Sequence, residues 1–158
     1  MATTCTHEHV DLGLAGAELK AELKAAEGRC AAERQRLTEP RRRALEMLLR
    51  AGQPVKAYDL LPRFHAGGKA AKPPTVYRAL EFLERRGLAH RIESLNAYVA
   101  CRRGPTTHAA AFLICDCCGA TREVEPKTAD LAALGAEAGY RLSSVTVEAH
   151  GFCPACAG

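Results

Sequence analysis

Residues 72–87, which read KPPTVYRALEFLERRG, carry the clearest structural pattern in this chain. Prolines at the start and Gly87 at the end delimit a helix, because proline suits only the first turn and glycine readily adopts the left-handed conformation that ends a helix. Apolar residues recur at helical spacing, which predicts one buried face. That face comprises Val76, Ala79, Leu80 and Leu83. The positions expected to lie off the core are Thr75, Tyr77, Arg78, Glu81 and Arg85.

The segments around this helix have an informative order. Upstream, capping and breaking residues predict helices over residues 17–36, 38–51 and 57–64. Downstream, the pattern changes to two strands and a turn, at residues 89–93, 97–101 and 94–96. The last three of these helices, followed by a two-stranded ribbon, have the order of a winged helix-turn-helix domain, whose last helix enters the major groove of DNA.

In such a domain the exposed Arg78 is placed to read a guanine edge, and Thr75 and Tyr77 are expected to contact DNA beside it. The cations expected near phosphates are Lys56, Lys72, Arg85 and Arg86. The alternative is an ordinary helical subdomain whose arginines are merely solvated. Charge favours DNA: residues 29–103 hold seventeen basic and seven acidic side chains, whereas acidic side chains outnumber basic ones in residues 1–28 and 104–158.

The rest of the chain predicts a smaller second domain. A polar segment, residues 102–107, reads as a hinge, and the elements beyond it are strands at 109–114, 121–124 and 140–149 and a helix at 128–138. We therefore expect an α+β protein: a tail and the start of the first helix over 1–28, a winged helix over 29–101, the hinge, and a small α/β domain over 108–158.

Two Cys-x-x-Cys pairs bracket this second domain, Cys115 with Cys118 and Cys153 with Cys156. Each short loop can aim two sulfurs at one ion, and four thiolates suit tetrahedral zinc. A structural zinc site is the favoured interpretation over unrelated thiols or two disulfides. Residues 1–16 have no apolar run typical of a signal peptide, so we expect a cytoplasmic protein, in which clustered cysteines are usually metal ligands.

A second set of candidate ligands lies at the wing and the hinge. His90 opens the wing, Cys101 closes it, His108 follows the hinge and Glu123 lies on the next predicted strand. Two imidazoles, a thiolate and a carboxylate also suit zinc. Taken singly, each residue has an ordinary structural explanation, such as a small buried cysteine. An ion held by all four would bias the relative orientation of the two domains and act as a switch.

Several of these motifs together resemble the ferric uptake regulator (Fur) family, and most closely its zinc-responsive branch. They are Leu37–Arg41, Ala57–Leu61, Lys72–Leu80, His108, Cys115–Cys118 and Glu148–Gly151 with Cys153–Cys156. The resemblance implies a dimeric, metal-dependent repressor that binds palindromic operator DNA of zinc-uptake genes and is released on zinc depletion. It implies two zinc ions per chain, one structural and one regulatory, at the two ligand sets above. It also implies that Tyr58 and Arg78 contact bases.

Some residues fall outside that resemblance. Cys117 lies inside the first cysteine pair and offers a competing thiol, and Cys5, His7 and His9 form a motif in the N-terminal tail. Cys30 is expected on a helix surface or at a dimer contact. His150 is expected to orient the last cysteine pair rather than to bind metal.

Other function classes fit less well. A thiol oxidoreductase would place its Cys-x-x-Cys pair at a helix N-terminus in a βαβ unit, and a hydrolytic zinc enzyme needs an open coordination position. We therefore expect no enzyme, no small organic substrate and no membrane partner. A family member that senses iron or peroxide is the remaining alternative, and Cys101 discriminates against it, since those sites favour histidine and carboxylate ligands.

Overall fold

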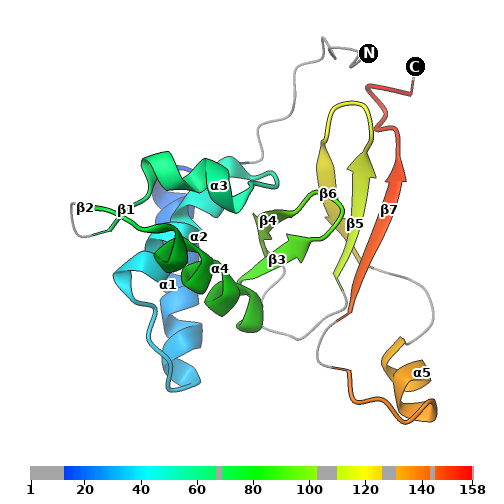
Figure 1. The fold of residues 1–158 in the computed structure, drawn as a ribbon, viewed down its shortest axis with the longest axis horizontal. Helices are drawn as coiled ribbons and strands as arrows, with labels where there is room; N and C mark the ends of the chain where they lie inside the picture. Colours follow the sequence, from blue (N-terminus) through cyan, green and yellow to red (C-terminus); the bar gives the residue numbers. More distant parts are fainter. Residues whose placement is uncertain (1–12, 67–68, 103–109, 126–130, 143–144, 158) are drawn as a thin grey trace. The chain divides into compact units, whose positions relative to one another are not determined.

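The structure is a computed structural model that describes residues 13–66, 69–102, 110–125, 131–142 and 145–157. The chain divides into two compact units (Figure 1), one formed by residues 11–106 and the other by the C-terminal part from residue 107. The hinge from residue 103, together with His108 and the N-terminal Cys5, His7 and His9, lies outside the described residues. In the described part of the chain, no helix has the length and apolar character needed to cross a bilayer.

The first unit is helical and ends in a β-ribbon. Its helices are α1 (Gly16–Ala32), α2 (Glu39–Ala51), α3 (Ala57–Leu60), a 3-10 turn η1 (Leu61–Arg63) and α4 (Pro73–Arg85). They enclose an apolar core in which Leu48, Phe64 and Leu80 are fully buried. The buried face predicted for α4 is confirmed, and Phe82 is buried in addition.

Two helix ends show how the backbone limits these elements. Gly52 ends α2 as predicted: its φ is 62°, and its N–H donates to the carbonyl of Leu48 over 3.1 Å. Helix α1 ends at Ala32, four residues before the predicted end, because Arg34 adopts a left-handed φ of 55°. A non-glycine residue in that conformation does not continue a right-handed helix.

The ribbon that follows α4 is the predicted wing. Strands β3 (Ala89–Ile92) and β4 (Ala97–Ala100) pair antiparallel, and Asn96, with a φ of 47°, turns the chain between them. A second, very short hairpin, β1 (His65–Ala66) with β2 (Lys69–Ala70), precedes α4. This hairpin was not predicted, because strands of two residues carry no alternation to detect.

The second unit is a three-stranded sheet with one helix. Strands β6 (Thr121–Val124), β5 (Ala110–Cys115) and β7 (Thr146–Gly151) lie in that order, and α5 (Leu131–Glu137) comes between β6 and β7 in the chain. Strand β5 pairs antiparallel with β6 and parallel with β7. The predicted strand 140–149 is shifted, because the pairing with β5 begins only at Thr146, opposite Ala110.

Candidate metal centre and nucleic-acid interface

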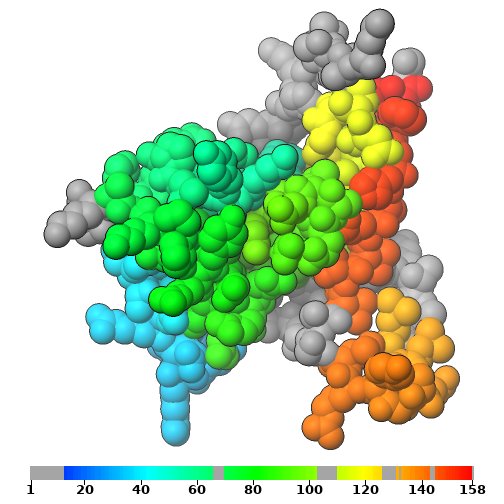
Figure 2. All heavy atoms as spheres, in the orientation of Figure 1, coloured from blue at the N-terminus to red at the C-terminus, as the bar shows by residue number. Residues whose placement is uncertain are grey.

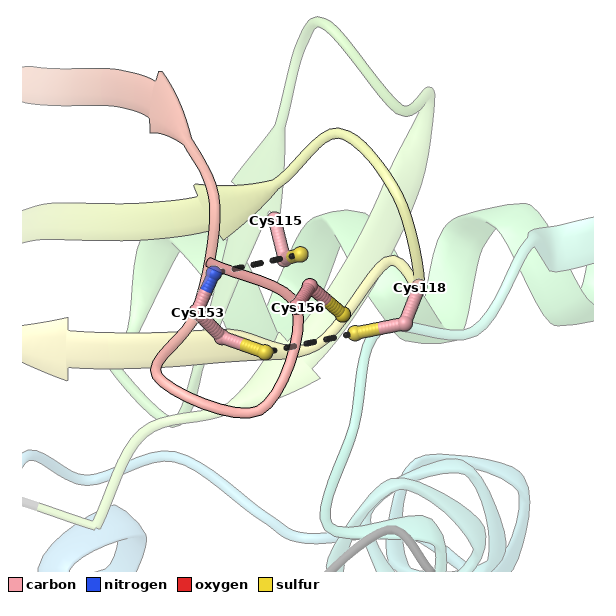
Figure 3. Close-up of side chains that lie close together, drawn as sticks. All are labelled: Cys115, Cys118, Cys153 and Cys156. Carbon is pink, nitrogen blue, oxygen red and sulfur yellow. Dashed lines mark hydrogen bonds between the residues drawn. The ribbon is translucent and has the colours of Figure 1, made fainter. Parts of the chain in front are cut away.

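Four cysteines of the second unit converge on one point (Figure 3). Strand β5 ends in Cys115, and the chain beyond β7 reaches Cys153. Because these two strands are parallel, both cysteine loops lie at the same end of the sheet. The four sulfur atoms lie within 4.8 Å of one another. None of these four cysteines is disulfide-bonded, so the alternative of two disulfides is not realised. Cys117 is not a member of this group.

The spacing of these sulfurs fits zinc. Zinc binds cysteine sulfur at about 2.3 Å, which gives about 3.8 Å between two sulfurs of a regular tetrahedron. The sulfurs of Cys118 and Cys153, one from each pair, lie 3.8 Å apart. Four soft ligands within 4.8 Å of one another match a closed structural zinc site, which leaves no coordination position for a substrate.

Backbone hydrogen bonds shape both loops. In the first loop, the N–H of Gly119 donates to the carbonyl of Cys115 over 2.8 Å, and Gly119 has the positive φ of 73° that this turn requires. In the last loop, the N–H of Cys156 donates to the carbonyl of Cys153 over 2.8 Å. The N–H of Cys153 also donates to the Cys115 sulfur over 3.3 Å, which joins the two loops.

The protonation of these thiols differs from one to the next. The backbone N–H of Cys118, followed by that of Cys153, lowers the pKa of Cys115 to about 6. Burial, followed by hydrogen bonds with the neighbouring sulfurs, raises the pKa of Cys156 well above its ordinary value. One thiolate therefore forms readily, whereas adding more negative charge at the same point is unfavourable without a cation. A divalent ion removes that obstacle, because it displaces the remaining protons.

Of the second predicted ligand set, two members lie in the first unit. His90 on β3 is half-buried, and Cys101, which follows β4, is buried. Antiparallel pairing brings the two ends of the wing together, so ligand atoms of His90 and Cys101 lie within 4.8 Å of each other. Glu123 belongs to the second unit, where it is half-buried on β6 opposite Phe112.

The exposed residues of α4 and α3 form the candidate nucleic-acid interface. Tyr58 on α3 is 75% exposed and Tyr77 on α4 is 45% exposed. The polar residues predicted with them are Arg78, Lys56 and Lys72, which are exposed, and Thr75, which is half-buried. Green atoms of α4 and the wing lie on the surface of the first unit in Figure 2. Large exposed aromatic side chains beside cations are expected where a protein meets nucleic acid.

The prediction for Cys30 was wrong. Its side chain is 2% exposed and belongs to the core, because Leu19, Leu23, Ala26 and Cys30 form one stripe along α1. Burial raises the pKa of this thiol, which makes it less reactive.

Sequence reasoning also missed a contact beside the four cysteines. His150 Nδ1 and Asp116 Oδ1 are 2.9 Å apart. The sequence predicts no role for Asp116, because a lone aspartate in a turn is common.

Known proteins resemble the chain over most of its length. The sequence pattern of the ferric uptake regulator family matches residues 32–150. The zinc uptake regulation protein of Escherichia coli (strain K12) is 42% identical over 137 residues, which cover 85% of this chain and 80% of that protein.

Among solved structures, a zinc uptake regulator complexed with zinc and DNA matches with a TM-score of 0.79 and 39% identity, over 90% of this chain and 97% of that chain. The holo form of XcZur matches with a TM-score of 0.74 and 40% identity, over 87% of this chain and 97% of that one. Its apo form matches with a TM-score of only 0.51 at 39% identity, over 90% of this chain and all of that one. The fold, the cysteine geometry and these similarities agree: the chain belongs to the ferric uptake regulator family, a family of regulators and not of enzymes.

Proposed function

We propose that this protein is a zinc-responsive transcriptional repressor of the cytoplasm. Loaded with zinc, it binds palindromic operator DNA of zinc-uptake genes as a homodimer, and it releases the DNA when zinc is depleted. The observation that carries this proposal is the match of nearly the whole chain to a zinc uptake regulator complexed with zinc and DNA. The four-sulfur group and the exposed aromatic and basic residues of α3 and α4 are consistent with it.

The first of two zinc ions per chain is structural in this proposal. Cys115, Cys118, Cys153 and Cys156 hold it and so fasten the end of β5 to the segment after β7. A small sheet with only a few buried side chains gains stability from such a staple. Because all four positions are filled by protein sulfur, the ion supplies cross-linking and no chemistry.

The second zinc ion is the signal. His90 and Cys101, already close together at the wing, provide two ligands, and His108 and Glu123 from the other side of the hinge complete the set. The support is the donor chemistry, in which a thiolate with imidazole favours zinc over harder ions. The relative XcZur adds to it: its holo and apo forms match this chain with very different TM-scores at nearly the same identity, so the two forms differ in conformation.

DNA is read by the first unit. Helix α4 enters the major groove, where Arg78 contacts a guanine edge and Thr75 and Tyr77 contact the groove. Tyr58 contacts a base from α3. Lys56 and Lys72 lie near phosphates and contribute affinity without sequence preference.

The second unit forms the dimer. Leu113 on β5 is 49% exposed and Val147 on β7 is 36% exposed. The strand register puts them on one face of the sheet, together with the exposed Ala149 and the buried Ala111. An exposed apolar sheet face of this kind is a typical subunit contact.

These parts combine into a population shift. Without the signal, each DNA-reading unit samples many orientations about the hinge, and the operator must select one of them. Joining the four ligands across the hinge restricts each unit to orientations in which two recognition helices match two half-sites about one helical turn apart. Operator affinity rises because zinc has already ordered the two units, so DNA binding no longer has to supply that entropy.

A Cys101→Ser variant tests this function. Fluorescence anisotropy on a palindromic duplex, at fixed salt and with free zinc set by a chelator buffer, should show zinc-dependent binding for the wild-type protein and none for the variant. The variant should keep the structural zinc. Equal zinc-dependent DNA binding by both proteins would refute the site as drawn, and a response of the wild-type protein to iron rather than zinc would favour the iron-sensing alternative.

A further inference from the structure

The contact between Asp116 and His150 joins the two cysteine loops. Asp116 directly follows Cys115, and His150 on β7 lies three residues before Cys153. The two side chains are 2.9 Å apart, from Nδ1 of the histidine to Oδ1 of the aspartate. Neither residue belongs to the four-sulfur group.

A second bond reinforces this contact from the backbone. The N–H of Asp116 donates to the carbonyl of Gly151 over 2.8 Å. Asp116 is thus bound to two successive residues at the end of β7, once through its main chain and once through its carboxylate. These bonds lie where the first loop leaves the sheet, immediately before the four sulfurs converge. They limit how far the two loops can separate.

We propose that Asp116 and His150 form a latch that holds the two cysteine pairs at the separation that zinc requires and slows the loss of zinc. Both are positioning residues, because they contact the loops and not the metal. This inference rests on the structural zinc proposed above. Zinc leaves a four-thiolate site by releasing sulfurs one at a time, and a latch that keeps both loops in place favours rebinding of a released sulfur.

His150 is better suited to this role than to binding metal. Its Nδ1 is occupied by Asp116, and its Nε2 lies 3.9 Å from the nearest carboxylate oxygen of Glu148, which exceeds hydrogen-bond distance. Among the described residues, the clusters with suitable ligand geometry do not include His150. One ring nitrogen and one carboxylate are too few for a tetrahedral site.

The size of the effect follows from exposure. The side chains of His150 and Asp116 are 38% and 52% exposed, so water screens their attraction. Pairs of this kind change an equilibrium by about fivefold or less. We expect the latch to change the rate of zinc release by a similar factor.

The test measures zinc release from the full-length protein in a Cys101→Ser background, which removes the regulatory zinc. Zinc is transferred to an excess of a chromophoric chelator, and the release rate is recorded. Asp116→Ala should release zinc about fivefold faster, and His150→Ala should do the same. Asp116→Asn keeps an oxygen that accepts the histidine N–H, so it should behave nearly as the parent. Glu137→Ala, which removes an exposed carboxylate of α5, is the matched control and should have no effect.

The outcomes separate the latch from the zinc site. If the parent protein retains no zinc, the structural zinc proposal itself fails. If the parent retains zinc and Asp116→Ala releases it at the parent rate, only the latch fails. The latch is also overturned if Asp116→Asn is as fast as Asp116→Ala, or if the effects of Asp116→Ala and His150→Ala multiply in the double variant. A true pair predicts a double variant no faster than either single one.

Discussion

Replacing Arg78 by alanine tests how α4 reads DNA. Arg78 is exposed on α4, whereas the preceding Val76 and the following Ala79 and Leu80 are buried and hold the helix in place. The substitution therefore removes a guanidinium without disturbing the core. A bidentate contact of arginine with guanine contributes about 1–3 kcal/mol of discrimination. We expect operator affinity to fall by roughly 5- to 150-fold.

Arg85 provides a matched control on the same helix. It lies seven residues, or about two turns, beyond Arg78, so it is on the same side of α4 and is also exposed. Only the N-terminal part of a recognition helix reaches base edges. Arg85→Ala should therefore weaken binding to all sequences alike and make the salt dependence about one unit shallower.

The assay is anisotropy at several salt concentrations, on the operator and on duplexes with single base changes. For Arg78→Ala, one guanine position should lose its preference, while the other positions keep theirs. Equal losses on operator and unrelated DNA would refute a base-reading role for Arg78. A larger specificity loss for Arg85→Ala than for Arg78→Ala would contradict the proposed orientation of α4.

The zinc sites give two further predictions. Zinc affinity of the four-cysteine site should rise between about pH 7 and pH 9, by about tenfold per pH unit for each proton released. Burial raises the pKa of Cys156, so this thiol must lose its proton when zinc binds. The Cys118 N–H lowers the pKa of Cys115 to about 6, so this thiol is already deprotonated in that range. Chelator competition at each pH measures this rise, and a flat profile would contradict it. Cys153→Ser should lose the structural zinc and lower the thermal midpoint of the second unit, while Cys30→Ser, in the core of the first unit, should keep its full zinc content by atomic absorption.

Local patterns predicted the first unit well. Helix α4 is marked at both ends by proline and glycine, and its buried face repeats at 3.6 residues, so its sequence alone constrains it strongly. The wing strands were predicted to within one residue for a similar reason, since Asn96 suits the turn between them. In each of these elements the local preferences and the tertiary contacts agree.

The errors occur where tertiary pairing overrides local preference. Strand β7 begins only where β5 offers a partner, and that register is invisible before the sheet is known. Cys30 was misplaced because alanines occur on both the buried and the exposed side of α1. The buried face of this helix therefore stands out only weakly in the sequence. The pair of His150 and Asp116 is separated by 34 residues, and only the parallel pairing of β5 and β7 brings it together.

The candidate zinc ligands were predictable to different degrees. Two Cys-x-x-Cys pairs contain four soft ligands with fixed local spacing, so their convergence needs only one long-range contact. His90 and Cys101 required the antiparallel register of the wing, which the turn between the strands sets. Their grouping with His108 and Glu123 came from donor chemistry and position around the predicted hinge, and the family resemblance added support to it.

The coupling between zinc binding and operator binding is the sharpest test of a zinc-responsive repressor. The affinity of the second zinc ion can be measured by chelator competition, with and without saturating operator duplex and at the same salt concentration. The proposed switch predicts that operator DNA tightens this zinc by the same factor by which zinc tightens DNA binding, because the two effects share one coupling free energy. An affinity for the second zinc that operator DNA leaves unchanged would contradict a zinc-responsive repressor.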